Sequence, residues 1–488
     1  MKPKYSISNI IKYSSGEIIS RIPLTLLEMS LVAILSPSLY GAWSLIQSLV
    51  SYGNFSHFGI ASSLTRKEPG LISKNLFAQI KKYRSNAYAS QIIIIIFISL
   101  ILILWNKIFK NSFELIGGYP SIIFLLITIY LQQLLIVGYS SSINELKIKL
   151  VSFLRIFYSL IFLFLGLLAA IYHKSIYSLL ISWSISLLVT FIILIRNVPS
   201  LRIKPEFDRH ITKLLLFDGF PILFQGLQRF AIVNIDRLFL IKVSTLENLG
   251  YYSIGLLASN LVSLPGTIIT KVTLPIILRR ISSLGFYTDE NKKVVKVSIM
   301  LIHKSCIFLG LILTVFLPII IRNLFPAYLP SLDLCTILII VGVEIGIAQS
   351  CIDFTLAVGK KKKILIITSL FIPIILISHS LFWINYKSIT FLAISLFICI
   401  TVYTSIIINI CLNYFKINRA ESKRINLIII SDILKYLILG LSYNFALNTS
   451  LDNKYYIILI IILISTSLII TEINSIIKVS KEYQKLNN

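Results

Sequence analysis

Charged residues are scarce in this sequence, and their scarcity excludes a soluble protein. Of the 488 residues only 14% are Asp, Glu, Lys or Arg, whereas 56% are hydrophobic and the mean hydropathy is +0.88. A soluble domain carries about 25% charged residues. The chain is therefore predicted to be an integral membrane protein, and its length leaves room for many spans of about 20 residues each.

Cysteine and histidine are also scarce, with five of each. The histidines are scattered and suggest no ligand set. The cysteines lie in or beside apolar runs without paired spacing, at Cys306, Cys335, Cys351, Cys399 and Cys411. This spacing argues against a disulfide framework and against a metal site. We therefore expect no metal ion and no cofactor.

Nucleotide-binding and targeting motifs are missing as well. The nearest approach to the GxxxxGK[ST] loop is VGKKKK at 358–363, which lacks the first glycine and the hydroxyl residue, so ATP hydrolysis is not expected. Residues 1–20 are basic and contain no short apolar core with a small-residue cleavage site, so we expect a cytoplasmic tail. The predicted loops are all short, which excludes an appended soluble domain.

What the sequence does contain is a long series of apolar segments, which predicts an all-α polytopic membrane protein of about 14 transmembrane helices. Polar residues interrupt the first, second and seventh of these segments. The predicted helices lie near 17–36, 40–63, 85–106, 120–143, 150–172, 175–195, 214–242, 249–277, 297–321, 330–358, 364–383, 388–413, 425–445 and 455–477.

The basic residues follow this predicted topology. The chain has 46 Lys and Arg against 20 Asp and Glu, a net charge of +26. With both termini placed inside, 33 of the 46 basic residues fall in the inside segments and 7 in the outside loops. Such a bias is the positive-inside rule. The excess charge therefore orients the helices and faces anionic lipid, and no nucleic-acid partner is expected.

Two windows of the sequence resemble each other and predict a repeat. Each begins with an arginine, Arg21 or Arg229, and has an acid seven residues later, Glu28 or Asp236. Each then reaches a short outside loop and a Gly-aromatic cluster, YGAWS at 40–44 and GYYS at 250–253. Parallel repeats about an axis along the membrane normal are a known transporter plan. We expect two six-helix bundles at 1–196 and 213–413, two further helices within 425–477, and a cytoplasmic tail at 478–488.

Charged residues inside the predicted spans are the candidate site. Asp218, Gln225, Arg229 and Asp236 recur at helical spacing and so share one stripe of the seventh helix. A charge at the centre of a span costs about 3 kcal/mol unless it is paired or hydrated, so such a stripe should face protein or water. On the first helix Glu17, Arg21 and Glu28 are arranged similarly.

From these charges we predict a cationic cavity that binds an anionic, phosphate-bearing substrate. Its basic residues would be Arg21, Arg229, Arg237, Lys271 and Lys304, because Arg in particular matches phosphate oxygens in bidentate geometry. The acids Glu28, Asp218 and Asp236 would balance this charge or take up a coupling ion.

Several of these residues have an alternative interpretation. Arg229 would otherwise form a buried pair with an acid of the first helix, and Arg237, Lys271 and Lys304 would otherwise extend to the headgroups. Asp432 and Lys435, three residues apart, are predicted to pair with each other.

Four segments are similar to a known family. They are LYGAWSLIQSLVSYGNFSHFGIASSLTRKEP at 39–69, NIDRLFL at 234–240, LGYYSIGLLASNLVSLPGTIITKVTLP at 249–275 and LFPAYLPSLDLCTILII at 324–340. With fourteen helices in two repeated bundles, the chain resembles the multidrug/oligosaccharidyl-lipid/polysaccharide exporter superfamily. Within it, the segments resemble the O-antigen and capsule-unit flippases (Wzx-type), and Asp236, Arg237 and Arg21 match charged positions of those proteins.

The resemblance implies a flippase of the bacterial inner membrane rather than an enzyme. Its substrate would be an oligosaccharide on undecaprenyl diphosphate, moved from the cytoplasmic to the periplasmic leaflet by alternating access. A polysaccharide polymerase and a chain-length regulator would be further partners. The alternatives are a cation-coupled multidrug or metabolite exporter, a peptidoglycan-precursor flippase and, from another class, a membrane glycosyltransferase or O-antigen polymerase. The enzymes usually need a large outer loop, which this chain does not have.

Overall fold

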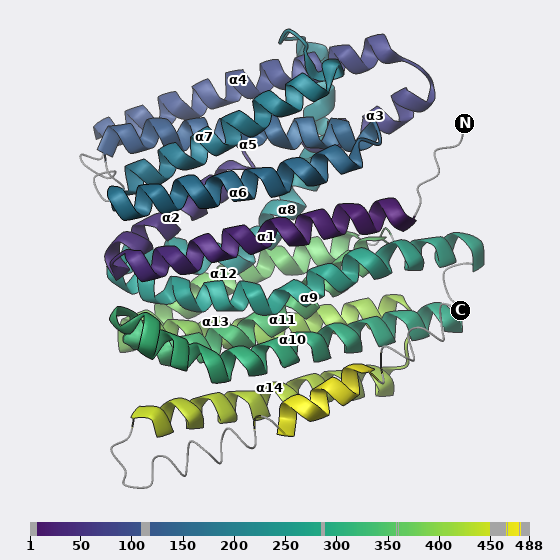
Figure 1. Cartoon of the computed structure of the whole chain (residues 1–488). Helices are drawn as coiled ribbons and strands as arrows, with labels where there is room; N and C mark the ends of the chain where they lie inside the picture. The colour runs from purple at the N-terminus through teal and green to yellow at the C-terminus, as the bar shows by residue number, and fades with distance from the viewer. Residues whose placement is uncertain are drawn as a thin grey trace. The chain divides into compact units, whose positions relative to one another are not determined.

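The computed structural model describes residues 7–108, 118–284, 288–357, 359, 361–448, 465, 467–477 and 479, and every regular element in these ranges is helical. Figure 1 shows the helices along the chain. They are α1 (Ile7–Ile34), α2 (Pro37–Gly53), α3 (Ile60–Ser73), α4 (Phe77–Ile108), α5 (Gly118–Asn144), α6 (Ile148–Tyr172), α7 (Ile176–Asn197), η2 (Pro199–Leu201), α8 (Arg209–Val243), α9 (Leu246–Leu284), α10 (Asp289–Leu324), η3 (Pro326–Ser331), α11 (Leu332–Ala357), α12 (Lys361–Tyr386), α13 (Ile389–Tyr414) and α14 (Arg419–Asn448).

The long apolar helices confirm an all-α polytopic membrane protein. Within the described ranges, ten helices are long and apolar enough to cross a membrane. The long helices α1 and α8 are not among these ten, and each carries several charges inside its apolar sequence. Most of the fourteenth predicted helix, 455–477, lies outside the described residues, although Ser467–Ile477 is helical. The count of fourteen spans therefore stays a prediction.

The second predicted span, 40–63, is wrong as a single helix. The chain instead forms α2 and α3, separated by a turn at 54–59. The turn contains two consecutive residues with positive φ, Phe58 at 47° and Gly59 at 93°. Such dihedrals are left-handed and cannot continue an α-helix. Ser36 caps the start of α2, where its side chain accepts a hydrogen bond from the Leu39 N–H, and Pro37 occupies the first helical position.

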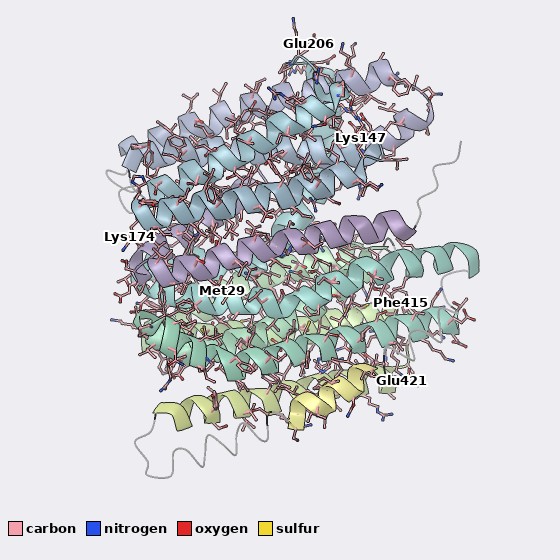
Figure 2. The ribbon with its side chains drawn as sticks, in the orientation of Figure 1. Met29, Lys147, Lys174, Glu206, Phe415 and Glu421 are labelled. Atoms are coloured by element: carbon pink, nitrogen blue, oxygen red, sulfur yellow. The ribbon has the colours of Figure 1, made fainter. Side chains whose placement is uncertain are left out.

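The chain divides into two compact units, Met1–Phe230 and Ala231–Asn488, and the boundary falls inside α8. In the first unit α1 packs along α6. A Cβ added at Gly16 would meet Ser152, and one at Gly166 would meet Leu27, so small residues allow the two backbones to approach closely. The ends of α6 are marked by Lys147 and Lys174 (Figure 2).

The second unit is built around α11, which is almost entirely buried. It packs against α9, α13 and α10. The contact with α9 is made backbone to backbone: a Cβ at Gly342 would meet the Ser259 main chain, and one at Gly266 would meet the Gly346 main chain. In membranes, where helices associate by close packing, such small-residue contacts are typical. The predicted bundle boundaries and their relation as parallel repeats stay predictions.

Candidate functional site

On α1, the structure holds one of the predicted acids inside the protein. Glu28 is half-buried, and its carboxylate accepts hydrogen bonds from Tyr40 Oη (3.3 Å), Trp43 Nε1 (3.3 Å) and Gln47 Nε2 (2.5 Å). These donors lie at positions 40, 43 and 47 of α2, at helical spacing, so they present one face to the carboxylate. Arg21, nearly two turns earlier on α1, is exposed. The YGAWS cluster therefore contains two of the donors that hold the acid of the first predicted repeat.

The equivalent acid of the second window lies in a comparable setting. Asp236 of α8 is fully buried, and Tyr252 of α9, also fully buried, is close enough to interact with it electrostatically. Trp43 and Tyr252 occupy matching positions in the two windows, each following its acid by about fifteen residues. In both units, therefore, an acid faces an aromatic side chain of the next helix, which supports the predicted repeat.

The basic residues predicted on α8 and α9 differ in exposure. Arg229 and Arg237 are half-buried and Lys271 is exposed, and all three take part in interactions within the protein. Asp218, predicted as a charge-balancing acid, is paired with Lys67 of α3, with Nζ and Oδ2 2.6 Å apart. Of the stripe on α8, Asp236 is thus the one fully buried acid, and the use of these residues in a substrate cavity stays a prediction.

Lys304 of α10 is held by acids. Its Nζ lies 2.8 Å from Asp432 of α14 and 3.1 Å from Glu472, and Asp432 also lies 3.2 Å from His303 Nε2. The predicted contact between Asp432 and Lys435 exists at 3.6 Å, but Lys435 is largely exposed. Asp432 is therefore mainly the partner of Lys304, and this cluster joins α10 to α14 and to the helix around Glu472.

A buried ionic network in the first unit was not predicted. Arg84 of α4 donates from Nε to Glu68 of α3 (2.7 Å) and from Nη1 to Glu145 after α5 (2.8 Å). Arg84 is 2% exposed and Glu68 0%. Glu68 also accepts hydrogen bonds from Ser141 and Asn144, both at 2.8 Å. We call Arg84, Glu68 and Glu145 the Arg84 network.

The predicted start of this helix at residue 85 was wrong, because α4 begins at Phe77 and includes Arg84. The helix begins early because residues 77–84 contain no proline or glycine that would interrupt it. The three members of the network lie in separate segments, so the spacing of residues along the sequence does not predict their contact.

Glu145 links the network to the segment after α7. Partial burial would raise the pKa of its carboxyl, but hydrogen bonds from Ser200, Arg84 and Lys147 outweigh burial and hold the pKa below its usual value. The Ser200 hydroxyl donates at 2.6 Å and the Lys147 ammonium lies 2.9 Å away. The acid therefore stays ionised and fixes the end of α5 against η2.

The first unit also contains a large apolar groove, which we call the α8 groove. Its volume is about 900 Å³, at the upper end of the range for ligand pockets. It is formed where the turn before α3, α4, the segment before α8 and the first half of α8 meet. Its lining residues are Phe58, Ile60, Ser90, Ile93, Ile94, Phe207, Arg209, Thr212, Lys213, Leu216, Phe217, Phe220 and Pro221.

Two glycines set the geometry of this groove. A Cβ on Gly219 of α8 would collide with the backbone of Gly59, and one on Gly59 would collide with Gly219 and the Phe220 N–H. Gly59 also has a φ of 93°, which side chains other than glycine rarely adopt. The turn before α3 and the helix α8 therefore touch through their main chains, beside Phe58 and Phe220 of the lining.

Comparison with known proteins places this fold. The family described as "Polysaccharide biosynthesis protein" matches residues 31–325, more than half of the chain. The chain belongs to this family. A search of curated protein sequences found no match.

Three solved structures with a similar fold are transporters or flippases. The lipid II flippase MurJ in its inward closed conformation is 17% identical, with a TM-score of 0.60 over 98% of this chain and 100% of that one. A point mutant of the MATE transporter VcmN from Vibrio cholerae is 16% identical, with a TM-score of 0.61 over 83% of this chain and 96% of that one. A transporter of the MOP superfamily from Pyrococcus furiosus is 15% identical, with a TM-score of 0.52 over 84% of this chain and 97% of that one.

The family match and the shared fold confirm the resemblance to the polysaccharide branch of the exporter superfamily. The family match shows a protein of polysaccharide biosynthesis, and the solved structures show a fold that is also found in transporters and in a flippase.

Proposed function

We propose that this polysaccharide biosynthesis protein is a flippase for an oligosaccharide carried on undecaprenyl diphosphate. It would move the lipid-linked unit from the cytoplasmic to the periplasmic leaflet of a bacterial inner membrane by alternating access, with both termini cytoplasmic. The observation that carries the proposal is the family match joined to a fold shared with a lipid II flippase over 98% of this chain. The MATE and MOP structures cover only 83–84%, which favours a flippase over a drug exporter.

Charged side chains within the helices are the proposed contacts for the diphosphate. Arg21, Arg229, Arg237 and Lys271 would bind its oxygens, because charge-assisted hydrogen bonds to phosphate are strong and directional. Lys304 was also predicted for this role, and its pairing with two acids means that it would first have to leave them.

The acids and the other partners follow from the same proposal. Glu28, Asp218 and Asp236 would balance the positive charge or take up a coupling ion. Asp236 supports this role best, because it is fully buried and its Oδ2 has no hydrogen-bond partner within the described part of the chain. The protein is proposed to need no cofactor and to catalyse no reaction. Its further partners would be anionic membrane lipids, a polysaccharide polymerase and a chain-length regulator.

The test is genetic complementation with sided detection of intermediates. The gene is deleted in its native host and replaced by wild type, Arg229→Ala, or Arg424→Ala, which removes an exposed arginine at the start of α14. Surface polysaccharide and lipid-linked units on each leaflet are then measured at matched expression. We expect deletion to trap units on the cytoplasmic side, Arg424→Ala to clear them and Arg229→Ala to fail.

Other outcomes separate the parts of the proposal. Full clearance by Arg229→Ala would show that this arginine has only a structural role. Intact polysaccharide in the deletion strain would refute the flippase assignment, and a drug-export assay would follow.

A further inference from the structure

The lining of the α8 groove has two properties that together favour a membrane lipid over a water-soluble ligand. Most of its wall is apolar, and several of its side chains are exposed at the protein surface: Phe217 is 82% exposed, Phe220 50% and Phe58 46%. On a membrane-spanning unit, exposed aromatic groups provide a surface that suits contact with hydrocarbon. The groove is therefore suited to a hydrocarbon chain that enters sideways from the bilayer.

One end of the groove is cationic. Arg209 and Lys213 both line it, and both are exposed. They are four residues apart at the start of α8, so they lie on one face of the helix. No acidic side chain is among the lining residues. The Asp208 carboxylate already caps the amino end of α8 by accepting hydrogen bonds from the His210 and Ile211 N–H groups, so the positive charge available to an anion is that of the two basic side chains.

Polar groups between the two basic residues hold this end in place. The Thr212 hydroxyl donates to Asn86 Oδ1 (2.8 Å) and lies 3.2 Å from the Ser90 hydroxyl, and Ser90 and Thr212 both line the groove. Asn86 in turn donates to the main-chain oxygen of Asp208 (2.8 Å). These bonds hold the start of α8 against α4 at the position from which Arg209 and Lys213 extend.

The basic end also lies where the cargo would start. The segment 196–213 is one of the strongly basic stretches that the charge bias assigns to the cytoplasmic face. A lipid-linked unit made in the cytoplasm has its phosphates at the surface of that leaflet and its hydrocarbon chain inside the membrane. The groove has the same arrangement, with basic residues at one end and an apolar wall beyond them.

We propose that the α8 groove binds the polyprenyl carrier of the cargo, with a carrier phosphate on Arg209 and Lys213 and the isoprenoid chain along Phe217, Phe220 and Ile94. The inference rests on the proposed flippase function and adds a binding site for the lipid part of the substrate. The groove lies in the first unit, and its lining contains none of the basic residues predicted to bind the substrate in the sequence analysis.

The experiment measures lipid binding to the purified full-length protein in nanodiscs. The probes are undecaprenyl phosphate and, as a competitor, phosphatidylglycerol, with retained lipid counted by native mass spectrometry. One variant removes the charge, Arg209→Ala/Lys213→Ala, and a matched control removes two exposed charges elsewhere on the first unit, Arg66→Ala/Lys82→Ala. A third, Ile94→Trp, fills the apolar wall, and a fourth, Arg209→Lys/Lys213→Arg, keeps the charge.

We expect wild type, the control and the charge-conserving variant to bind undecaprenyl phosphate alike. Loss of a charge-assisted contact should weaken binding about tenfold or more in Arg209→Ala/Lys213→Ala, and Ile94→Trp should weaken it as well. Because Arg209 and Lys213 are exposed, the double alanine variant should fold, which thermal unfolding and gel filtration check.

Two results would overturn the inference. One is unchanged binding in both the alanine and tryptophan variants. The other is displacement of undecaprenyl phosphate by equimolar phosphatidylglycerol, which would make the groove an ordinary phospholipid site. Complementation separates this inference from the proposed function: if deletion blocks polysaccharide export while the alanine variant restores it and binds normally, only the groove assignment fails. If deletion has no effect on polysaccharide, the flippase proposal fails whatever the groove binds.

Discussion

Replacing Arg84 should destabilise the first unit strongly, because it would leave a carboxylate buried without its cation. Arg84 is 2% exposed and Glu68 0%, and the two share a hydrogen bond of 2.7 Å. Removing one partner of a buried pair costs about 3–5 kcal/mol. In Arg84→Met, Glu68 would keep its hydrogen bonds from Ser141 and Asn144. We therefore expect the free energy of unfolding to fall by an amount near the lower end of this range, about 3 kcal/mol.

The assay is thermal unfolding of the purified protein in one detergent. For a unit of this size, about 1 kcal/mol lowers Tm by roughly 2–4 °C, so Arg84→Met should lower it by roughly 6–12 °C. Arg66→Met, which replaces an exposed arginine on α3, is the matched control and should change stability by less than about 0.5 kcal/mol. The double variant Glu68→Gln/Arg84→Met removes both charges and should recover part of the loss.

The result that would refute this reasoning is a Tm for Arg84→Met no lower than that of Arg66→Met. A double variant less stable than Arg84→Met alone would also contradict it. In that case the buried carboxylate would not be the source of the loss.

Three further predictions concern packing, pairing and pH. Gly219→Ala should lower Tm, because the added Cβ would collide with the Gly59 main chain. Gly70→Ala, whose Cβ would have open space, should not lower it, and equal effects of the two changes would contradict the main-chain contact at the α8 groove. Lys304→Met should cost about 3–5 kcal/mol because it removes the ammonium group that Asp432 and Glu472 share. Lys435→Met, at a side chain that is 69% exposed, should be nearly neutral in the same unfolding assay. Because the Glu145 pKa is lowered by folding, its contribution is present above the usual carboxyl pKa and is lost as pH falls through the lowered value. Unfolding scans at several pH values should therefore show wild type losing its advantage over Glu145→Gln on acidification, and a constant difference would contradict this.

Much of the fold follows from local sequence, because hydropathy is a local property. The apolar runs predicted the long helices α4 to α7 and α9 to α13 to within a few residues at many of their ends. The break between α2 and α3 was missed, because the sequence alone does not show that Phe58 and Gly59 both adopt positive φ values. Glu28 and Asp236 were found because each follows an arginine at the same distance in the sequence.

The partners of the charges could not be predicted in the same way. Lys304 meets acids more than 120 residues away in the sequence, and Arg84 joins Glu68 of α3 to Glu145 after α5. A single sequence carries no signal for such long-range pairs. The α8 groove was likewise out of reach, because its wall comes from segments on both sides of α4 and its shape depends on the contact between Gly59 and Gly219.

The glycine contacts between α9 and α11 have a consequence for how motion in this protein can be measured. At Gly342 there is no room for a Cβ beside the Ser259 main chain, so a rotation of either helix that brought a larger side chain into this contact would produce a clash. We therefore expect α9 and α11 to move as one piece in any transport cycle. A pair of spin labels on the outer ends of these two helices would give a constant distance under all conditions, and so an internal ruler against which changes elsewhere can be calibrated.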